Sequence, residues 1–158
     1  MAERWLGLTA SKDSVVMVDA EIPDDGDDPI IIHSDDTWRV QKGDRAEAYN
    51  VLHHQCADYV KENAIDVVVV KASAVAGKGS ATLGFLLSAE VRGIVIAAAA
   101  SHCPVKALSK AVISRTYGDR KVDEYLADDS FWADNTNGGE LRKLSREAAM
   151  LLIAARNA

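Results

Sequence analysis

A short stretch in the middle of the chain, residues 66–70, constrains the fold most. Its last four residues are all valine, a β-branched residue that is favoured in strands. A strand with apolar side chains on both faces is stable in the interior of a sheet that is covered by helices on both sides. The sequence therefore predicts a buried central strand here, in a protein of the α/β class.

Apolar patterning predicts three strands before this run. The predicted strands are 5–8, 14–20 and 30–33, with a tight turn at 11–13, and 38–40 continues the sheet. The acidic stretches 23–29 and 34–36 have no apolar anchor, so we expect an exposed loop and a turn.

Helical periodicity predicts the other elements. Asp44 is a natural N-cap, with Glu47 three residues later as in a capping box, for an amphipathic helix to about Asn63. A long Ala-rich helix follows the central strand and is apolar on most faces, so we expect it to be largely buried. The remaining predictions are this helix at 81–100, a strand at 104–108, helices at 109–115 and 121–126, a polar loop at 134–139 and a helix at 140–156.

The length and the element order favour a single domain. A chain of 158 residues has the size of one domain, spanning 1–158. Three leading antiparallel strands followed by alternating helices and parallel strands is the order of the ribonuclease-H-like fold. We therefore expect a three-layer α/β domain with a mixed five-stranded sheet and helices on both faces.

Charge and cysteine content narrow the classes of function. The net charge of −6 argues against a protein that coats polyanions nonspecifically. Cys56 and Cys103 are far apart in sequence and do not resemble a secreted disulfide framework, which favours the cytoplasm. The first residues lack a signal pattern, and the apolar run 93–100 is too short to span a membrane, so no membrane partner is expected.

Several short motifs lie between residues 66 and 118: the valine strand, then Ala81-Thr82-Leu83-Gly84, Glu90-Val91-Arg92-Gly93, Pro104-Val105 and Arg115-Thr116-Tyr117-Gly118. Together they resemble the Holliday-junction resolvase RuvC and its relatives. The first strand, ending at Thr9, and the last helix, from Glu147 to Ala155, are similar to the corresponding family elements.

The resemblance implies two divalent metals, held by an acid on the first strand, an acid at the end of the central strand and acids on the last helix. In this sequence these positions hold Thr9, Lys71 and Glu147. Two ligands are replaced, and one replacement is a cation. We therefore predict a catalytically inactive domain, a pseudonuclease with no metal or other cofactor, in which Lys71 and Glu147 form an ion pair with Thr9 close by.

Candidate binding residues follow the central strand. A glycine-rich turn between a strand and a helix presents backbone N–H groups to anions, and basic residues further along suggest a positive face. The alternative is a flexible turn followed by ordinary solvated helices. The candidate nucleic-acid-binding or anion-binding residues are Gly77, Lys78, Gly79, Ser80, Lys106, Lys110 and Arg115, with Arg120 and Lys121 extending the basic segment.

Histidines and cysteines offer a weaker hypothesis. His53 and Cys56 share a helix face, whereas His102 and Cys103 are adjacent and point apart, which is poor spacing for structural zinc. Nothing in the sequence places a base beside either thiol. We expect core cysteines and surface histidines.

Three functions remain open. The first is an inactive RuvC-like domain that binds nucleic acid or a protein partner. The second is a metal-dependent nuclease with a relocated acid set, and the third is a structural module that forms homo-oligomers. A homodimer is expected because RuvC relatives pair. The relocated acids would be Asp19, Asp66, Glu90 and Glu147.

Overall fold

Six strands form one mixed sheet in the computed structural model, which describes residues 2–74, 82–118 and 120–157. The strand order is β5-β4-β1-β2-β3-β6. The first three strands are antiparallel, and β4 and β5 lie parallel to β1. The strands are β1 (Glu3–Ala10), β2 (Ser14–Ile22), β3 (Ile30–Arg39), β4 (Val67–Lys71), β5 (Val105–Leu108) and β6 (Thr136–Gly138).

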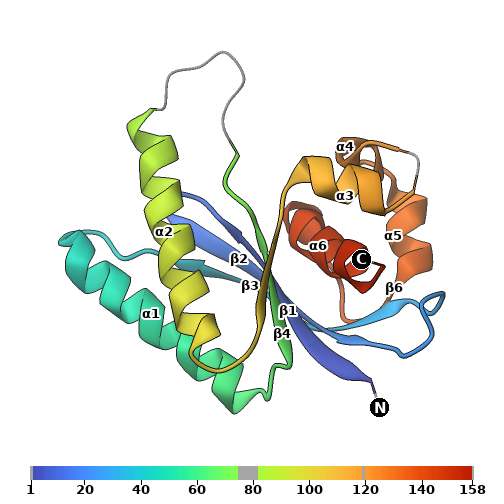
Figure 1. Ribbon diagram of the computed structural model, residues 1–158, viewed down its shortest axis with the longest axis horizontal. Coiled ribbons are helices and arrows are strands. Elements are labelled where there is room, and N and C mark those ends of the chain that lie inside the picture. Colours follow the sequence, from blue (N-terminus) through green and yellow to red (C-terminus); the bar gives the residue numbers. More distant parts are fainter. Residues whose placement is uncertain (1, 75–81, 119, 158) are drawn as a thin grey trace.

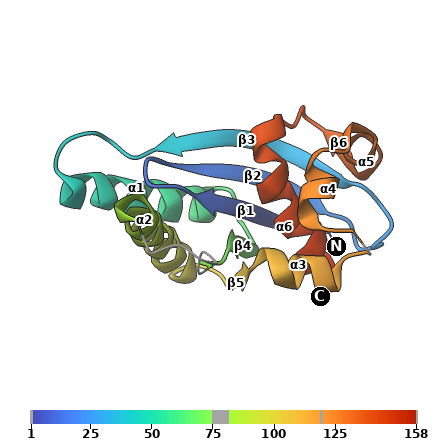
Figure 2. The same ribbon diagram turned by 90° about the horizontal axis from the view of Figure 1, so that it is seen from above.

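Helices cover both faces of this sheet (Figures 1 and 2). Two long helices pack against each other on one face, and the C-terminal helix crosses the other face with the shorter helices around it. The helices are α1 (Arg45–Glu62), α2 (Leu83–Ala100), α3 (Lys110–Thr116), α4 (Val122–Leu126), α5 (Asp129–Asn135) and α6 (Arg146–Arg156), with a 3-10 turn at Lys143–Ser145. The predicted three-layer ribonuclease-H-like fold is confirmed.

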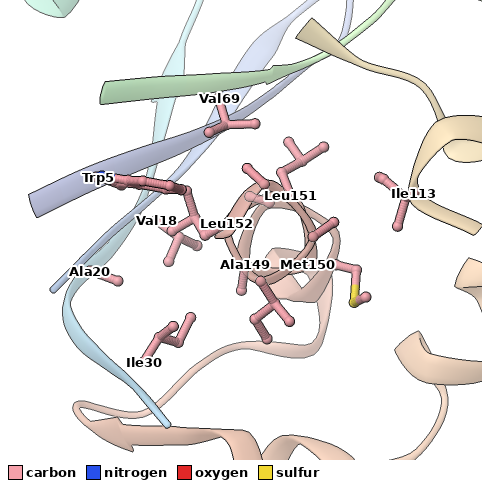
Figure 3. Packing of buried hydrophobic residues seen from close by; sticks show 14 of the residues in the cluster. Trp5, Val18, Ala20, Ile30, Val69, Ile113, Ala149, Met150, Leu151 and Leu152 are labelled. Carbon is pink, nitrogen blue, oxygen red and sulfur yellow. The ribbon is translucent and has the colours of Figure 1, made fainter. Parts of the chain in front are cut away.

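The valine run forms the buried centre of the sheet, as predicted. Val68, Val69 and Val70 are fully buried. Because side chains alternate along a strand, Val69 faces α6 while its two neighbours face α1 and α2. Figure 3 shows Val69 in the core around α6, together with Trp5 and the aliphatic residues of that helix.

Two sequence predictions about the sheet are wrong. The stretch 34–36 is not a turn, because β3 runs without a break from Ile30 to Arg39. Its carboxylate Asp35 is held by Arg142 and Ser145, so the acidic residue is stable inside the strand. The sheet also has six strands rather than five: residues 134–139 include the short strand β6, which lies parallel to β3.

The helix predictions need two corrections. The C-terminal helix begins at Arg146 rather than at 140, and α5 was not predicted. The helix α2 is less buried than expected, with only four fully buried residues. By length and composition α2 is the one described helix that could cross a membrane, and only 22% of it is buried within this domain. It packs against α1 and the sheet.

Candidate functional site

The ends of β1 and β4 meet the start of α6, and this junction contains the three positions that the resemblance singled out. β1 and β4 are paired in parallel up to Leu8 and Val70, so Thr9 and Lys71 are the next residues at the same end of the sheet. Lys71 follows Val69 by two positions and therefore faces α6. Glu147 lies in the first turn of α6, where the helix dipole favours a negative charge.

Gly7 allows α6 to approach β1 closely enough to form this junction. A Cβ atom at Gly7 would lie 2.3 Å from the carbonyl oxygen of Ala148, far inside contact distance. The backbones of β1 and α6 therefore touch at this point. Glu147 precedes Ala148, so the same close approach fixes the carboxylate near the strand ends.

Lys71 and Glu147 form the predicted ion pair. Lys71 Nζ donates to Glu147 Oε2 at 3.0 Å, and the two side chains are 29% and 23% exposed. A second ammonium group, on Lys110 at the start of α3, lies 3.9 Å from the same oxygen and 3.0 Å from Asp123 Oδ1. Two lysines and two carboxylates thus alternate at this junction and neutralise one another.

The side chains at this junction do not fit a pair of divalent metals. Such a site needs several carboxylate oxygens converging on one point, whereas Thr9 and Lys71 supply a hydroxyl and a cation. The remaining carboxylate, Glu147, already accepts a hydrogen bond from Lys71. Within residues 2–74, 82–118 and 120–157, no three His, Cys, Asp or Glu side chains gather in a metal-binding arrangement.

The relocated acid set is not assembled either. Asp19 is fully buried and accepts hydrogen bonds from Arg4 and Tyr59. Glu90 instead accepts from Tyr49 Oη on α1. Asp66 accepts from the backbone N–H of Arg4, and Glu147 is paired with Lys71 at the strand end. These four carboxylates therefore do not converge on one metal centre.

A third carboxylate near α6, that of Asp35, also has its hydrogen-bond partners within the domain. Asp35 accepts hydrogen bonds from the backbone and the guanidinium of Arg142 and from the hydroxyl of Ser145. Burial by itself would raise the pKa of Asp35, but these hydrogen bonds and the Arg142 charge outweigh it, so the pKa is lowered. Asp35 therefore stays ionised and ties β3 to the chain just before α6.

The predicted basic residues lie along β5 and α3. Lys106 Nζ lies 5.3 Å from the centroid of the Trp5 ring, and Arg115 is exposed in the last turn of α3. Lys110 and Lys121 line an open groove of about 300 Å³ together with Ala111, Val122 and the acidic Asp123. The predicted glycine-rich turn, Gly77 to Ser80, lies outside the described residues.

The other basic residue of this segment is engaged within the domain. Arg120 pairs with Asp128 at 3.0 Å and lies 4.3 Å from the centroid of the Tyr125 ring. It therefore helps to join the short helices rather than extending a free positive face.

The cysteines and histidines make only structural contacts within the part of the chain that the structure describes. Burial, followed by the nearby Cys103, raises the pKa of Cys56 to about 12, so its thiol is protonated at neutral pH. Cys56 Sγ donates to the carbonyl oxygen of Val95. His53 and His54 make an edge-to-face contact with each other, with their ring centroids 5.7 Å apart.

Sequence reasoning missed the second cation at the junction. The helices α3, α4 and α5 lie between Lys110 and Glu147 in the sequence, and no periodicity predicts their contact. Only the packing of α3 against α6 brings them together.

Comparison with solved structures identifies the fold. A scan of protein-family models gives no match to this sequence, and neither does a search of curated proteins. The RuvC structure from Thermus thermophilus matches with a TM-score of 0.71 and 11% identity, over 96% of this chain and 92% of that one. The chain has the RuvC-like fold.

Two further RuvC-like structures match over almost the whole chain. One is T. thermophilus RuvC in complex with a Holliday junction substrate, with a TM-score of 0.65 and 9% identity over 96% of this chain and 91% of that one. The other is the yeast mitochondrial Holliday junction resolvase Ydc2, with a TM-score of 0.65 and 12% identity over 98% of this chain and 78% of that one. The shared feature is therefore the fold of the entire domain.

Proposed function

We propose that this chain is a RuvC-like domain that binds nucleic acid and does not cut it. The observation that carries the proposal is the Lys71–Glu147 ion pair at the junction of β1, β4 and α6. Lys71 stands at the position where the resemblance implies a metal-binding acid, and its partner Glu147 is the one carboxylate of that set present in this sequence. Binding without metal-dependent hydrolysis is the function that this arrangement supports.

The distribution of charge supports nucleic acid as the ligand. Residues 1–66 contain 15 acids and six lysines or arginines, whereas residues 67–158 contain nine acids and 12 lysines or arginines. The strand order places β4 and β5 at one edge of the sheet and β3 and β6 at the other. The acidic first half would repel a polyanion, leaving the basic β5–α3 side, with Lys106 and Arg115, to receive it.

A binding assay at several salt concentrations tests this proposal. A fluorescent four-way junction and a linear duplex of the same length are titrated with protein, and each mixture is then incubated with Mg²⁺ or Mn²⁺. We expect affinity to fall steeply with salt, as phosphate contacts require, and both substrates to remain intact. If the protein does not bind either substrate at low salt, the proposal that its ligand is nucleic acid is wrong. If it cleaves a substrate with metal, and Glu147→Gln abolishes this cleavage, the proposal that it is inactive is wrong.

The exposed face of α2 supports a second proposal, that the protein forms a homodimer. Leu83 and Leu86 are 71% and 53% exposed, and Phe85 beside them is 40% exposed. An apolar helix face of this kind is stabilised when it is buried against another surface. We propose that a second copy of the chain covers it, because the RuvC relatives that this sequence resembles pair.

Sedimentation equilibrium tests the dimer. We expect a dimer for the native chain and a monomer for Leu83→Asp/Leu86→Asp, with unchanged circular dichroism. Val51→Asp, which changes an exposed apolar residue on α1 instead, is the matched control and should leave the dimer intact. A native chain that is monomeric at concentrations of tens of micromolar would refute this proposal.

A further inference from the structure

Arg92 is the one arginine of α2, and no carboxylate of the described residues pairs with it. Arg92 Nη1 donates to Ser73 Oγ at 2.7 Å, and its Nε is buried with no hydrogen-bond partner. The guanidinium is partly buried, and this burial lowers the pKa of Arg92.

Three other partly buried cations of this domain each have a carboxylate partner, whereas Arg45 and Arg156 donate to uncharged oxygens of Tyr49 and Asp28. Arg4 pairs with Asp19, Lys71 with Glu147 and Arg146 with Asp129, at 2.7, 3.0 and 2.8 Å. A desolvated charge without a partner destabilises a folded protein. The position of Arg92 is therefore unfavourable in the free domain, and an anion supplied from outside would remove that cost.

The surroundings of Arg92 place it at the same strand end as the lysines. Ser73 follows Lys71 by two residues, and the chain leaves β4 between α2 and α3 (Figures 1 and 2). Two residues along a helix correspond to a rotation of about 200°, so Arg92 points away from the side on which Glu90 contacts α1. The lysine of this strand end is neutralised by Glu147, whereas Arg92 is not.

We propose that Arg92 binds a phosphodiester group of the nucleic-acid backbone at the end of β4, with Ser73 as the residue that positions its guanidinium. This inference rests on the function proposed above and names one contact of that function. A guanidinium that is anchored through one terminal nitrogen can donate to a phosphate oxygen through the other. In Arg92, Nε is enclosed by the protein and Nη1 is held by Ser73, so Nη2 is the donor left for the phosphate.

Matched variants test the contact. Arg92→Gln removes the charge at this position, and Arg39→Gln removes the same charge from an exposed site on β3. We expect Arg92→Gln to bind a linear duplex about tenfold more weakly and to lower the slope of log affinity against log salt by about one. Arg39→Gln should change neither quantity, and Arg92→Lys should recover part of the affinity.

Thermal unfolding separates this role from a structural one. Because the charge of Arg92 is unpaired in the free domain, Arg92→Gln should leave the melting temperature unchanged or raise it while weakening binding. Ser73→Ala should weaken binding less, because it removes only the hydroxyl that positions the guanidinium. A lower melting temperature together with native affinity would assign Arg92 to folding and overturn the inference.

A spectroscopic measurement observes the guanidinium of Arg92 itself. The Nε–Hε signal of Arg92, assigned by its loss in Arg92→Gln, should shift when the native protein is titrated with the duplex. Native protein that binds while Arg92→Gln binds equally well, with no shift of this signal, would overturn the inference and leave the proposed function standing. Native protein that binds no duplex at all would refute both.

Discussion

The ion pair at the strand end predicts a specific pattern in a double-mutant cycle. The perturbations are Lys71→Met, which keeps most of the side-chain volume, and Glu147→Gln, which keeps the shape of the carboxylate. After Lys71→Met, Glu147 still has Lys110, whose Nζ lies 3.9 Å from the same oxygen. After Glu147→Gln, Lys71 and Lys110 face each other without the charge that lies between them.

The geometry sets the expected magnitudes. Two unit charges 3.0 Å apart attract by about 5 kcal/mol at an effective dielectric constant of about 20. Both side chains are roughly a quarter exposed, and desolvation offsets most of this attraction. We therefore expect Lys71→Met to cost about 1 kcal/mol and Glu147→Gln about 2 kcal/mol, with a coupling energy of about 1 kcal/mol.

Urea unfolding followed by circular dichroism measures the four free energies of unfolding. The double variant should be more stable than the sum of the two single changes predicts, by the coupling energy. Lys110→Met in the Lys71→Met background provides the control, because it removes the remaining cation and should then destabilise the domain further. Additive single changes, within about 0.3 kcal/mol, would refute the pairing.

Three further predictions follow from the fold. Gly7→Ala should destabilise the domain by about 3 kcal/mol or more in urea unfolding, because its Cβ would overlap the carbonyl oxygen of Ala148. The pKa of Asp35 is lowered in the folded state, so Asp35 contributes fully to the free energy of unfolding above its ordinary pKa of 3.8, and this contribution is lost as the pH falls from there through the folded pKa. Asp35→Asn should remove that part of the acid dependence of stability, measured by urea unfolding at several pH values. Iodoacetamide at pH 8 should label Cys56 only after unfolding, whereas labelling of the less buried Cys103 should start in the native state, as peptide mass spectrometry can show.

Much of the fold could be predicted because its signals are local. The valine run is apolar on both faces and could only be a covered central strand, and Asp44 caps α1 by accepting a hydrogen bond from Ala46 N, as predicted. The continuity of β3 could not be predicted, because Asp35 is stabilised by Arg142, more than one hundred residues away. Charged residues within an apolar segment normally indicate a turn. Only the distant partner Arg142 explains why Asp35 lies within a strand.

The helix α2 shows a different limit of sequence reasoning. Its apolar residues lie on nearly all sides, and such composition normally indicates a core helix. In this domain one side of α2 remains outside, at Leu83 and Leu86. An apolar composition indicates that a helix is stabilised by burial, but it does not show whether the surface that covers the helix belongs to the same chain.

The candidate site could be predicted in part for a similar reason. Corresponding positions in a shared fold lie at the same place, so Lys71 and Glu147 could be paired from the resemblance even though α6 begins six residues later than expected. The contact between Lys110 and Glu147 depends on how α3 packs on α6. The lack of a carboxylate near Arg92 is likewise a property of the tertiary structure. Neither property is written in a local pattern.

A crystal grown or soaked in Mn²⁺, with anomalous diffraction collected above the manganese absorption edge, tests the central claim most directly. The claim is that an ammonium group, not a metal, neutralises Glu147 at the junction of β1, β4 and α6. We predict no manganese peak at this junction, with Lys71 Nζ within hydrogen-bond distance of Glu147. A manganese ion bound to Glu147, with Lys71 displaced, would contradict the account.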